Sequence, residues 1–163
     1  MTIKVGDKIA SATLMEMQEG KPTPIKTDEF FAGRKVALFA LPGAFTPTCS
    51  AKHVPGFLAN YDTLRQKGVD AIACVSVNDA FVMGAWAKDQ KTDGKVHMLA
   101  DGNGDFTRAL GLEFDAGKFG MGKRSQRYSM IVDDGLVKSI NVEEPGAFDV
   151  SSAEYLLSSG QLP

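Results

Sequence analysis

Long apolar runs alternate with mixed segments along the chain, and this pattern predicts alternating strands and helices. Residues 35–41 read KVALFAL, an almost wholly apolar run typical of a central strand that is buried on both faces. Residues 69–77 read VDAIACVSV and predict a second buried strand, which we expect to run parallel to the first through a right-handed crossover. Between them, residues 47–68 predict one helix that is kinked at Pro55 and ends at Gly68.

The same alternation continues to the end of the chain. Residues 78–90 predict a helix capped by Asn78 or Asp79, residues 95–101 a third strand, and residues 105–112 a short helix. Residues 127–142 predict a hairpin that turns at Asp134-Gly135. A last helix is expected over residues 151–160, from Ser151 or Ser152 to Gly160.

These elements, together with a hairpin expected within residues 3–17, predict an α/β chain of the thioredoxin-like type. Such a fold has a central mixed sheet flanked by helices, here with an N-terminal hairpin extension. We expect one domain over residues 1–163, since no repeat or linker interrupts the pattern.

Composition narrows the class of protein. The chain is 44% hydrophobic and 23% charged, and its formal net charge is -2, so no basic excess favours nucleic acid or anionic membranes. No run of apolar residues has the length of a membrane span, and the first ten residues lack the pattern of a signal peptide. We therefore expect a cytoplasmic protein with no nucleic-acid and no membrane partner. The two cysteines form no disulfide framework or zinc motif, and no cofactor motif is visible, so neither a metal nor a cofactor is expected.

The run LPGAFTPTCS places a cysteine at a predicted helix start. Thr46 suits the N-cap, Pro47 the first helical position, and Cys49 then falls at the third, where its N–H has no partner within the helix. Free N–H groups and the positive end of the helix dipole favour an anion there. The spacing therefore indicates a site that stabilises a thiolate.

Segments along nearly the whole chain resemble the peroxiredoxins, in particular the type II or peroxiredoxin-5-like subfamily. The resemblance is strongest in LPGAFTPTCSAKHVPGF and RYSMIV. It implies that Cys49 reduces hydrogen peroxide and alkyl hydroperoxides and becomes a sulfenic acid. It also implies that Pro42, Thr46 and Arg127 complete the catalytic site.

Each of these residue types suits the chemistry. The guanidinium of Arg127 stays charged and offers several donors in a fixed fork to the thiolate and the peroxide. The hydroxyl of Thr46 both donates and accepts, and the ring of Pro42 shields the sulfur from water. The backbone N–H of Thr48 would point into the same spot as that of Cys49.

Aromatic residues near the motif have two interpretations. Phe45 and Phe119 are candidate substrate-binding residues, and Met121 shares the loop of Phe119. Phe45, Phe81, Val82 and Trp86 would form either an apolar rim and homodimer surface or part of the core. The homodimer rests on the resemblance.

Cys74 lies in the middle of a predicted buried strand, and we expect it to pack there rather than to react. Some relatives close a disulfide with a cysteine near the C-terminal helix, but residues 143–157 contain none. An external thiol is therefore expected to reduce the sulfenic acid, with glutaredoxin and glutathione favoured and thioredoxin second.

His53 supports a different function. It follows Cys49 by four residues, so the two share a helix face, and a Cys–His pair activates sulfur in many hydrolases and transferases. We favour a packing or hydrogen-bonding role for His53, and a structural role for His97. Three classes of function remain: a thiol peroxidase, a Cys–His hydrolase or transferase, and a redox-inert interaction module with a thioredoxin fold.

Overall fold

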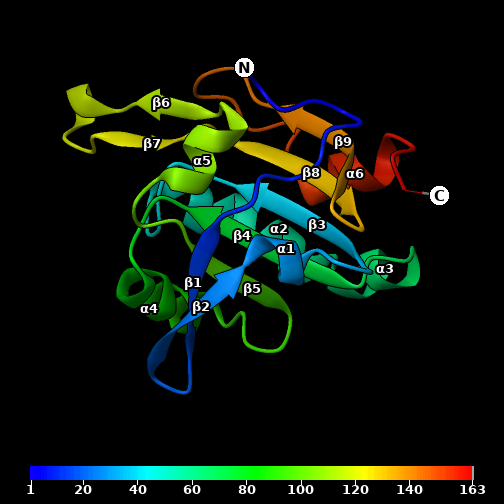
Figure 1. Ribbon diagram of the computed structural model, residues 1–163, viewed down its shortest axis with the longest axis horizontal. Helices are drawn as coiled ribbons and strands as arrows, with labels where there is room; N and C mark the ends of the chain where they lie inside the picture. The colour runs from blue at the N-terminus through cyan, green and yellow to red at the C-terminus, as the bar shows by residue number, and fades with distance from the viewer. Residues whose placement is uncertain (163) are drawn as a thin grey trace.

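A seven-stranded mixed sheet forms the centre of the molecule (Figure 1). The computed structural model describes residues 1–162. The strand order is β2-β1-β5-β4-β3-β8-β9. These strands are β1 (Thr13–Gln18), β2 (Lys21–Lys26), β3 (Lys35–Ala40), β4 (Ala71–Ser76), β5 (Val96–Ala100), β8 (Tyr128–Asp133) and β9 (Leu136–Val142). A separate two-stranded sheet, absent from the predicted pattern, pairs β6 (Glu113–Asp115) with β7 (Lys123–Ser125).

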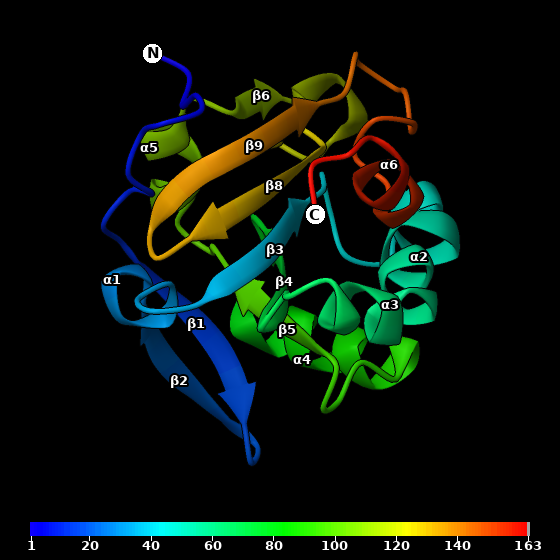
Figure 2. The same cartoon turned by 90° about the vertical axis from the view of Figure 1, so that its right-hand side faces the viewer.

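Helices cover both faces of the large sheet (Figure 2). One face buries Phe39, Ile72 and Cys74, and the other buries Leu38 and Val75, because successive side chains of a strand point to opposite faces. Residues of η1, α2, α3, α4 and α6 belong to the first core, and residues of α1 and α5 to the second. The bounds are α1 (Thr27–Phe30), η1 (Cys49–His53), α2 (Val54–Ala59), α3 (Tyr61–Gln66), α4 (Ala80–Gln90), α5 (Asp105–Leu110), η2 (Gly117–Phe119) and α6 (Ala153–Ser158).

The central strands confirm the pattern read from the sequence. Strand β4 runs parallel to both β3 and β5, whereas β8 runs antiparallel to β3. The β8–β9 hairpin turns at Asp134 and Gly135, both with positive φ, as predicted. Asp79 caps α4 by accepting from the N–H of Val82, and Ser152 caps α6 by accepting from the N–H of Tyr155.

The prediction of a single kinked helix over residues 47–68 is wrong. A π-helical turn, η1, leads into α2, and a break at Asn60 separates α2 from α3. Pro55 explains the wide turn, because it has no N–H to donate and its ring would clash with the carbonyl four residues earlier in a regular helix. Single π turns of this kind occur frequently at functional sites.

The position predicted for the N-terminal hairpin is also wrong. Residues 3–12 carry only an isolated bridge between Lys8 and Leu136, and the hairpin is formed by β1 and β2 with its turn at Glu19-Gly20. Gly20 has a φ of 77° and Glu19 a φ of 51°, the left-handed pair that a tight hairpin needs. No helix among residues 1–162 is long and apolar enough to cross a membrane.

Candidate active site

Cys49 lies where the chain leaves β3 and enters a helix. Pro47 is the first helical residue, and the first bond within the helix runs from the N–H of Ser50 to the carbonyl of Thr46, at 2.9 Å. The N–H of Cys49 therefore precedes the internal hydrogen bonds, as the sequence indicates. The side chain of Cys49 is fully buried, on the same face of the sheet as Cys74.

Thr46 holds the N-cap position but does not cap the helix with its side chain. Its hydroxyl donates to the carbonyl of Gly43 at 2.7 Å. Thr48 makes no side-chain cap either. The hydroxyl oxygen of Thr46 keeps its acceptor capacity, and the first-turn N–H groups are not taken by a side chain, so both remain available to a ligand.

A polar network that the sequence did not reveal holds the loop before this helix. The Oδ1 of Asn78 accepts from the N–H of Ala44 at 3.0 Å and from the hydroxyl of Ser76 at 2.6 Å. Arg124 donates to the carbonyl of Val77 at 3.1 Å. A Cβ added to Gly43 would lie 3.3 Å from the Arg124 Nη1 and 3.4 Å from the Met121 Cε. Strand β7 and the residue Met121 just before it therefore pack directly on the loop that carries Pro42 and Thr46.

Phe45 sits at the tip of that loop in a strained conformation. Its φ is 64°, a left-handed value that costs a bulky residue about 1–2 kcal/mol, and its side chain is 52% exposed. Its ring centroid lies 6.3 Å from that of Trp86. Trp86 itself is fully buried and donates to the hydroxyl of Ser50 at 3.0 Å, so it belongs to the core. Phe81 is 66% exposed and Val82 half-buried.

Arg127 reaches Cys49 across the sheet. Its Nη2 lies 3.1 Å from the Cys49 Sγ. Tyr128, the next residue, pairs with Ala40 at the end of β3, so the antiparallel β3–β8 pairing brings Arg127 beside the chain that leads to Cys49. A half-buried guanidinium thus lies within hydrogen-bond distance of a fully buried sulfur.

His53 binds Arg127 rather than the sulfur. Its Nδ1 lies 2.9 Å from the Arg127 Nη1, and its Nε2 lies 3.0 Å from the carbonyl oxygen of Ser151. The carbonyl only accepts and the guanidinium only donates, so Nε2 carries the proton and Nδ1 accepts. Burial, and then the charge of Arg127, lower the pKa of His53 to about 3. His53 is therefore neutral at physiological pH, with both nitrogens occupied, which leaves no lone pair to take a proton from Cys49 and is consistent with the hydrogen-bonding role preferred from the sequence.

No hydrogen bond described for residues 1–162 joins Cys74 to a cation. Cys74 lies fully buried in β4, opposite Phe39 of β3, and burial together with the nearby Cys49 raises the pKa of its thiol. These surroundings suit a packed thiol and disfavour a thiolate.

Of the other site residues predicted from the sequence, Pro42 lies in the loop before Cys49, whereas Phe119 lies in a separate segment. Pro42 is half-buried in the loop that precedes Thr46. Phe119 lies in η2, is 68% exposed, and is contacted by the Lys118 ammonium, 5.2 Å from its ring centre. No contact described for residues 1–162 joins Phe119 to Cys49, whereas Met121 from the same loop packs near Gly43.

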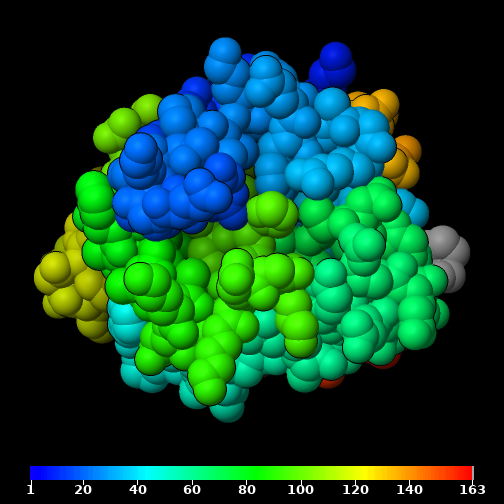
Figure 3. Space-filling view, turned by 90° about the horizontal axis from the view of Figure 1, so that it is seen from below, coloured from blue at the N-terminus to red at the C-terminus, as the bar shows by residue number. Residues whose placement is uncertain are grey.

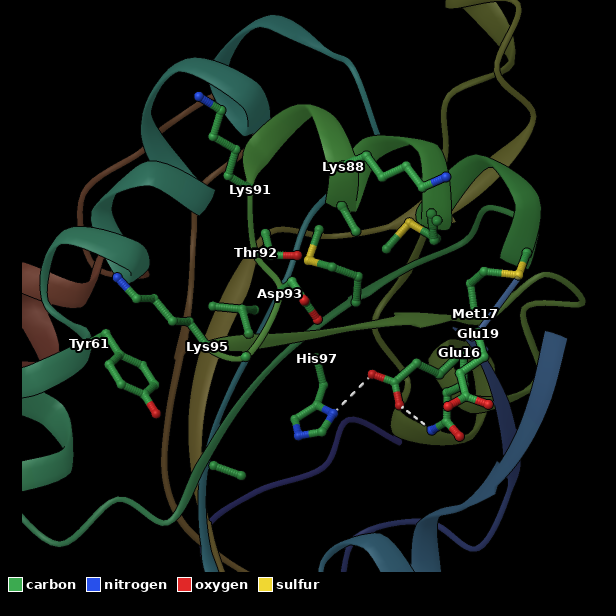
Figure 4. A pocket seen from close by; sticks show the side chains of 18 of the residues that line it. Glu16, Met17, Glu19, Tyr61, Lys88, Lys91, Thr92, Asp93, Lys95 and His97 are labelled. Atoms are coloured by element: carbon green, nitrogen blue, oxygen red, sulfur yellow. Dashed lines mark hydrogen bonds and ion pairs between the residues drawn. The ribbon is translucent and has the colours of Figure 1, made fainter. Parts of the chain in front are cut away.

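A cavity lies away from Cys49. It measures about 1120 Å³ and is bordered by the β1–β2 hairpin, the end of α4 and β5, on the face shown in Figure 3. Figure 4 shows His97 facing Glu16 at one side of it, whereas Lys88 and Lys91 extend from the end of α4 on the other side. The His97 Nδ1 lies 2.9 Å from the Glu16 Oε2. None of Cys49, Thr46 and Arg127 lines it. Over residues 1–162 no group of three or more His, Cys, Asp or Glu is arranged to hold a metal ion.

Known proteins resemble this chain over nearly its whole length. The family described as Redoxin matches residues 4–157. The chain is 51% identical over 162 residues to the chloroplastic peroxiredoxin-2E of Arabidopsis thaliana, covering 97% of this chain and 69% of that protein.

Two solved structures extend the comparison. Reduced Prx3 of Vibrio vulnificus, in complex with hydrogen peroxide, superposes with a TM-score of 0.93 at 51% identity, over 97% of this chain and 99% of that one. Peroxiredoxin 5 of Alvinella pompejana superposes with a TM-score of 0.78 at 44% identity, over 86% and 90% of the two chains.

Proposed function

Because the chain belongs to the redoxin family, and within it to the type II or peroxiredoxin-5-like peroxiredoxins, which are thiol peroxidases, we propose that Cys49 is its peroxidatic cysteine and that hydrogen peroxide and alkyl hydroperoxides are its substrates. The contact between the Arg127 Nη2 and the Cys49 Sγ, at 3.1 Å, is the observation that carries this proposal. It supplies the cation that a thiolate nucleophile requires.

In the proposed reaction the Cys49 thiolate attacks one oxygen of the peroxide. A sulfur–oxygen bond forms, the O–O bond breaks, and its electron pair leaves on the second oxygen as hydroxide or alkoxide, which takes up a proton. The sulfur is thereby oxidised to sulfenic acid and the peroxide is reduced to water or an alcohol.

Five groups around the sulfur would assist this step. Arg127 holds the thiolate and the charge that develops on the leaving oxygen. The hydroxyl of Thr46 and the N–H groups of Thr48 and Cys49 orient the peroxide, and the half-buried Pro42 limits the entry of water. We propose Phe45, exposed beside the helix start, as a contact for the alkyl part of a substrate. Phe119 remains a weaker candidate because it is exposed in η2, with no described contact to these residues.

An external thiol would close a one-cysteine cycle. Glutathione attacks the sulfenic sulfur, releasing water and forming a mixed disulfide, and a second thiol, from glutaredoxin or glutathione, restores Cys49. Glutaredoxin with glutathione is the favoured donor and thioredoxin the second. The complete burial of Cys74 and its raised pKa support a cycle without it.

We also propose a homodimer formed near this site. Phe45 and Phe81 are large apolar side chains with 52% and 66% of their surfaces exposed, which a partner copy would cover. Phe81→Asp is expected to give a monomer by light scattering at micromolar concentration, and Phe119→Asp, at a similar exposure but on η2, serves as the control.

A cytoplasmic location stays a prediction, which cell fractionation would test; the compared plant relative is chloroplastic.

The decisive experiment is the loss of hydroperoxide in the presence of glutathione and glutaredoxin, together with mass spectrometry after one equivalent of peroxide. One oxygen gained on Cys49 and turnover with a thiol donor are expected. Hydrolysis of a thioester or peptide without peroxide consumption would instead favour the Cys–His hydrolase.

A further inference from the structure

A ring of hydrogen-bonded residues lies behind Arg127 and includes the buried carboxylate of Glu143. Glu143, just after β9, is only 7% exposed. Its Oε2 accepts from the N–H of Asp149 at 2.6 Å, from the N–H of Ser151 at 2.8 Å and from the hydroxyl of Ser151 at 2.6 Å. A buried carboxylate with three donors on one oxygen fixes the backbone of the segment that supplies them.

That segment holds His53. The carbonyl of Ser151 accepts from the His53 Nε2 at 3.0 Å, and this bond leaves the lone pair of Nδ1 facing the Arg127 Nη1, 2.9 Å away. The other terminal nitrogen of Arg127, Nη2, contacts the Cys49 sulfur. The direction in which the guanidinium points therefore depends on the position of one backbone carbonyl.

Glu143 also holds Arg127 from the backbone side. The N–H of Glu143 donates to the carbonyl of Arg127 at 2.9 Å. These hydrogen bonds therefore form a ring that starts and ends at Arg127. From the Arg127 guanidinium it passes through His53, Ser151 and the Glu143 carboxylate, and the Glu143 N–H closes it on the Arg127 carbonyl. Phe148 covers the ring from one side, with its centroid 5.1 Å from that of His53 and 5.9 Å from the Arg127 guanidinium carbon.

We propose that Glu143 is a positioning residue for the peroxidase reaction, which acts through Ser151 and the protonated Nε2 of His53 to aim Arg127 at the Cys49 sulfur. This inference rests on the proposed function, since it specifies how that site is held. Burial raises the pKa of Glu143, but hydrogen bonds from Ser151 and Asp149 outweigh that effect and keep the pKa below its usual value. The group is therefore an anion at neutral pH and accepts from all three donors.

Glu143→Gln tests the proposal, with Glu144→Gln as the matched control. The substitution keeps the shape of the side chain, but an amide oxygen carries no charge and cannot hold three donors as strongly. Glu144 is the adjacent carboxylate and is exposed. We expect peroxide reduction to slow about tenfold in Glu143→Gln, by analogy with the loss of a group behind a directly acting ligand, and to stay unchanged in Glu144→Gln.

Nitrogen NMR of the imidazole rings separates positioning from a purely structural effect. The chain has two histidines, so His97→Gln assigns the signals of His53. The wild type should show a His53 ring protonated on Nε2 alone, and Glu143→Gln should show a mixture of the two neutral tautomers at unchanged circular dichroism. Ser151→Ala, which removes only one donor to Glu143, should give a smaller change in the same direction.

The outcomes are distinguishable. An active wild type with unchanged His53 signals and an unchanged rate in Glu143→Gln would overturn this inference and leave the proposed function intact. A wild type that reduces no hydroperoxide would overturn the proposed function, whatever the histidine signals show. If Glu143→Gln does not fold, Ser151→Ala tests the proposal instead. An unchanged rate and unchanged His53 signals in that variant would contradict the positioning role of Glu143.

Discussion

The two cysteines of this protein are equally buried but differ in their neighbours, because Cys49 contacts Arg127 and Cys74 packs inside a strand. Neither Cys49 nor Cys74 exposes any surface, and both belong to the core on the same face of the sheet. Cys49 sits at a helix start with a guanidinium nitrogen 3.1 Å from its sulfur. Cys74 sits in the middle of β4, where burial and the nearby Cys49 raise the pKa of its thiol.

If Cys49 is the reactive thiol, as proposed, burial alone does not decide whether a thiol reacts. Removing a thiolate from water costs free energy in both places, and a positive partner or hydrogen-bond donors must offset that cost. The helix start contributes about 0.3–1 kcal/mol, which is smaller than the cost of burying a charge, so the proposed reaction needs Arg127 for most of the remainder. The proposed reactivity therefore depends on a long-range contact.

The largest expected effect comes from exchanging each sulfur for oxygen. Cys49→Ser should abolish turnover of hydroperoxide, because a serine hydroxyl is not ionised at neutral pH and has no arginine-stabilised anion to attack with. Cys74→Ser should retain most of the activity when glutathione and glutaredoxin are supplied. A coupled peroxidase assay measures both. Equal losses in the two variants would mean that Cys74 takes part in the cycle.

Replacing Arg127 removes the cation beside Cys49 and should lower the reactivity of Cys49 toward that of Cys74. Arg127→Gln is expected to slow peroxide reduction roughly 100-fold, the usual effect of losing one donor to a developing oxyanion. Arg127→Lys keeps the charge but not the fork that contacts both Cys49 and His53, so its rate should lie between those of the wild type and Arg127→Gln. A rate in Arg127→Gln close to the wild-type rate contradicts the assignment.

His53 should contribute to the pH dependence of stability more than to the chemistry. The unfolded chain binds a proton on His53 below its usual pKa of 6.5, whereas the folded protein keeps the ring neutral down to about 3. This contribution to stability is therefore complete above the unfolded value and is lost as the pH falls through this window. Between about pH 7 and about pH 5 the loss should be about 2 kcal/mol, measured by urea unfolding.

His53→Gln should remove this pH dependence, and His97→Gln should keep it. The peroxide rate should fall less in His53→Gln than in Arg127→Gln, because glutamine still offers an acceptor to the guanidinium. A larger fall in His53→Gln would revive the Cys–His alternative.

The smallest expected effect concerns packing. Cys74→Ala leaves a small cavity in the core and should lower the free energy of unfolding by about 1 kcal/mol, with little change in peroxide rate. Urea unfolding and the peroxidase assay measure the two quantities. A clear loss of rate at nearly full stability would give Cys74 a chemical role.

Local patterns were sufficient for most of the fold. The apolar runs at β3, β4 and β5 and the turn at Asp134-Gly135 were predicted, because each depends on residues close in sequence. Each helix cap was narrowed to two candidates, and the structure selects Asp79 over Asn78 and Ser152 over Ser151. Two local features were misread. The π turn before Pro55 competes with a regular helix, and the hairpin turn at Glu19-Gly20 lies beyond the segment chosen from the sequence.

By itself, the sequence determined the helix start at Cys49, the buried strands and the resemblance to peroxiredoxins, which alone singled out Arg127. The tertiary structure decided which of the two nitrogens of His53 carries the proton, which side of the guanidinium faces the sulfur, and that Glu143 holds the segment behind them. The residues involved lie 78, 74 and 98 positions apart in the pairs Arg127–Cys49, Arg127–His53 and His53–Ser151. Contacts at such separations are set by the order of strands in the sheet, because only the pairing of β3 with β8 and of β8 with β9 brings these groups within hydrogen-bond distance.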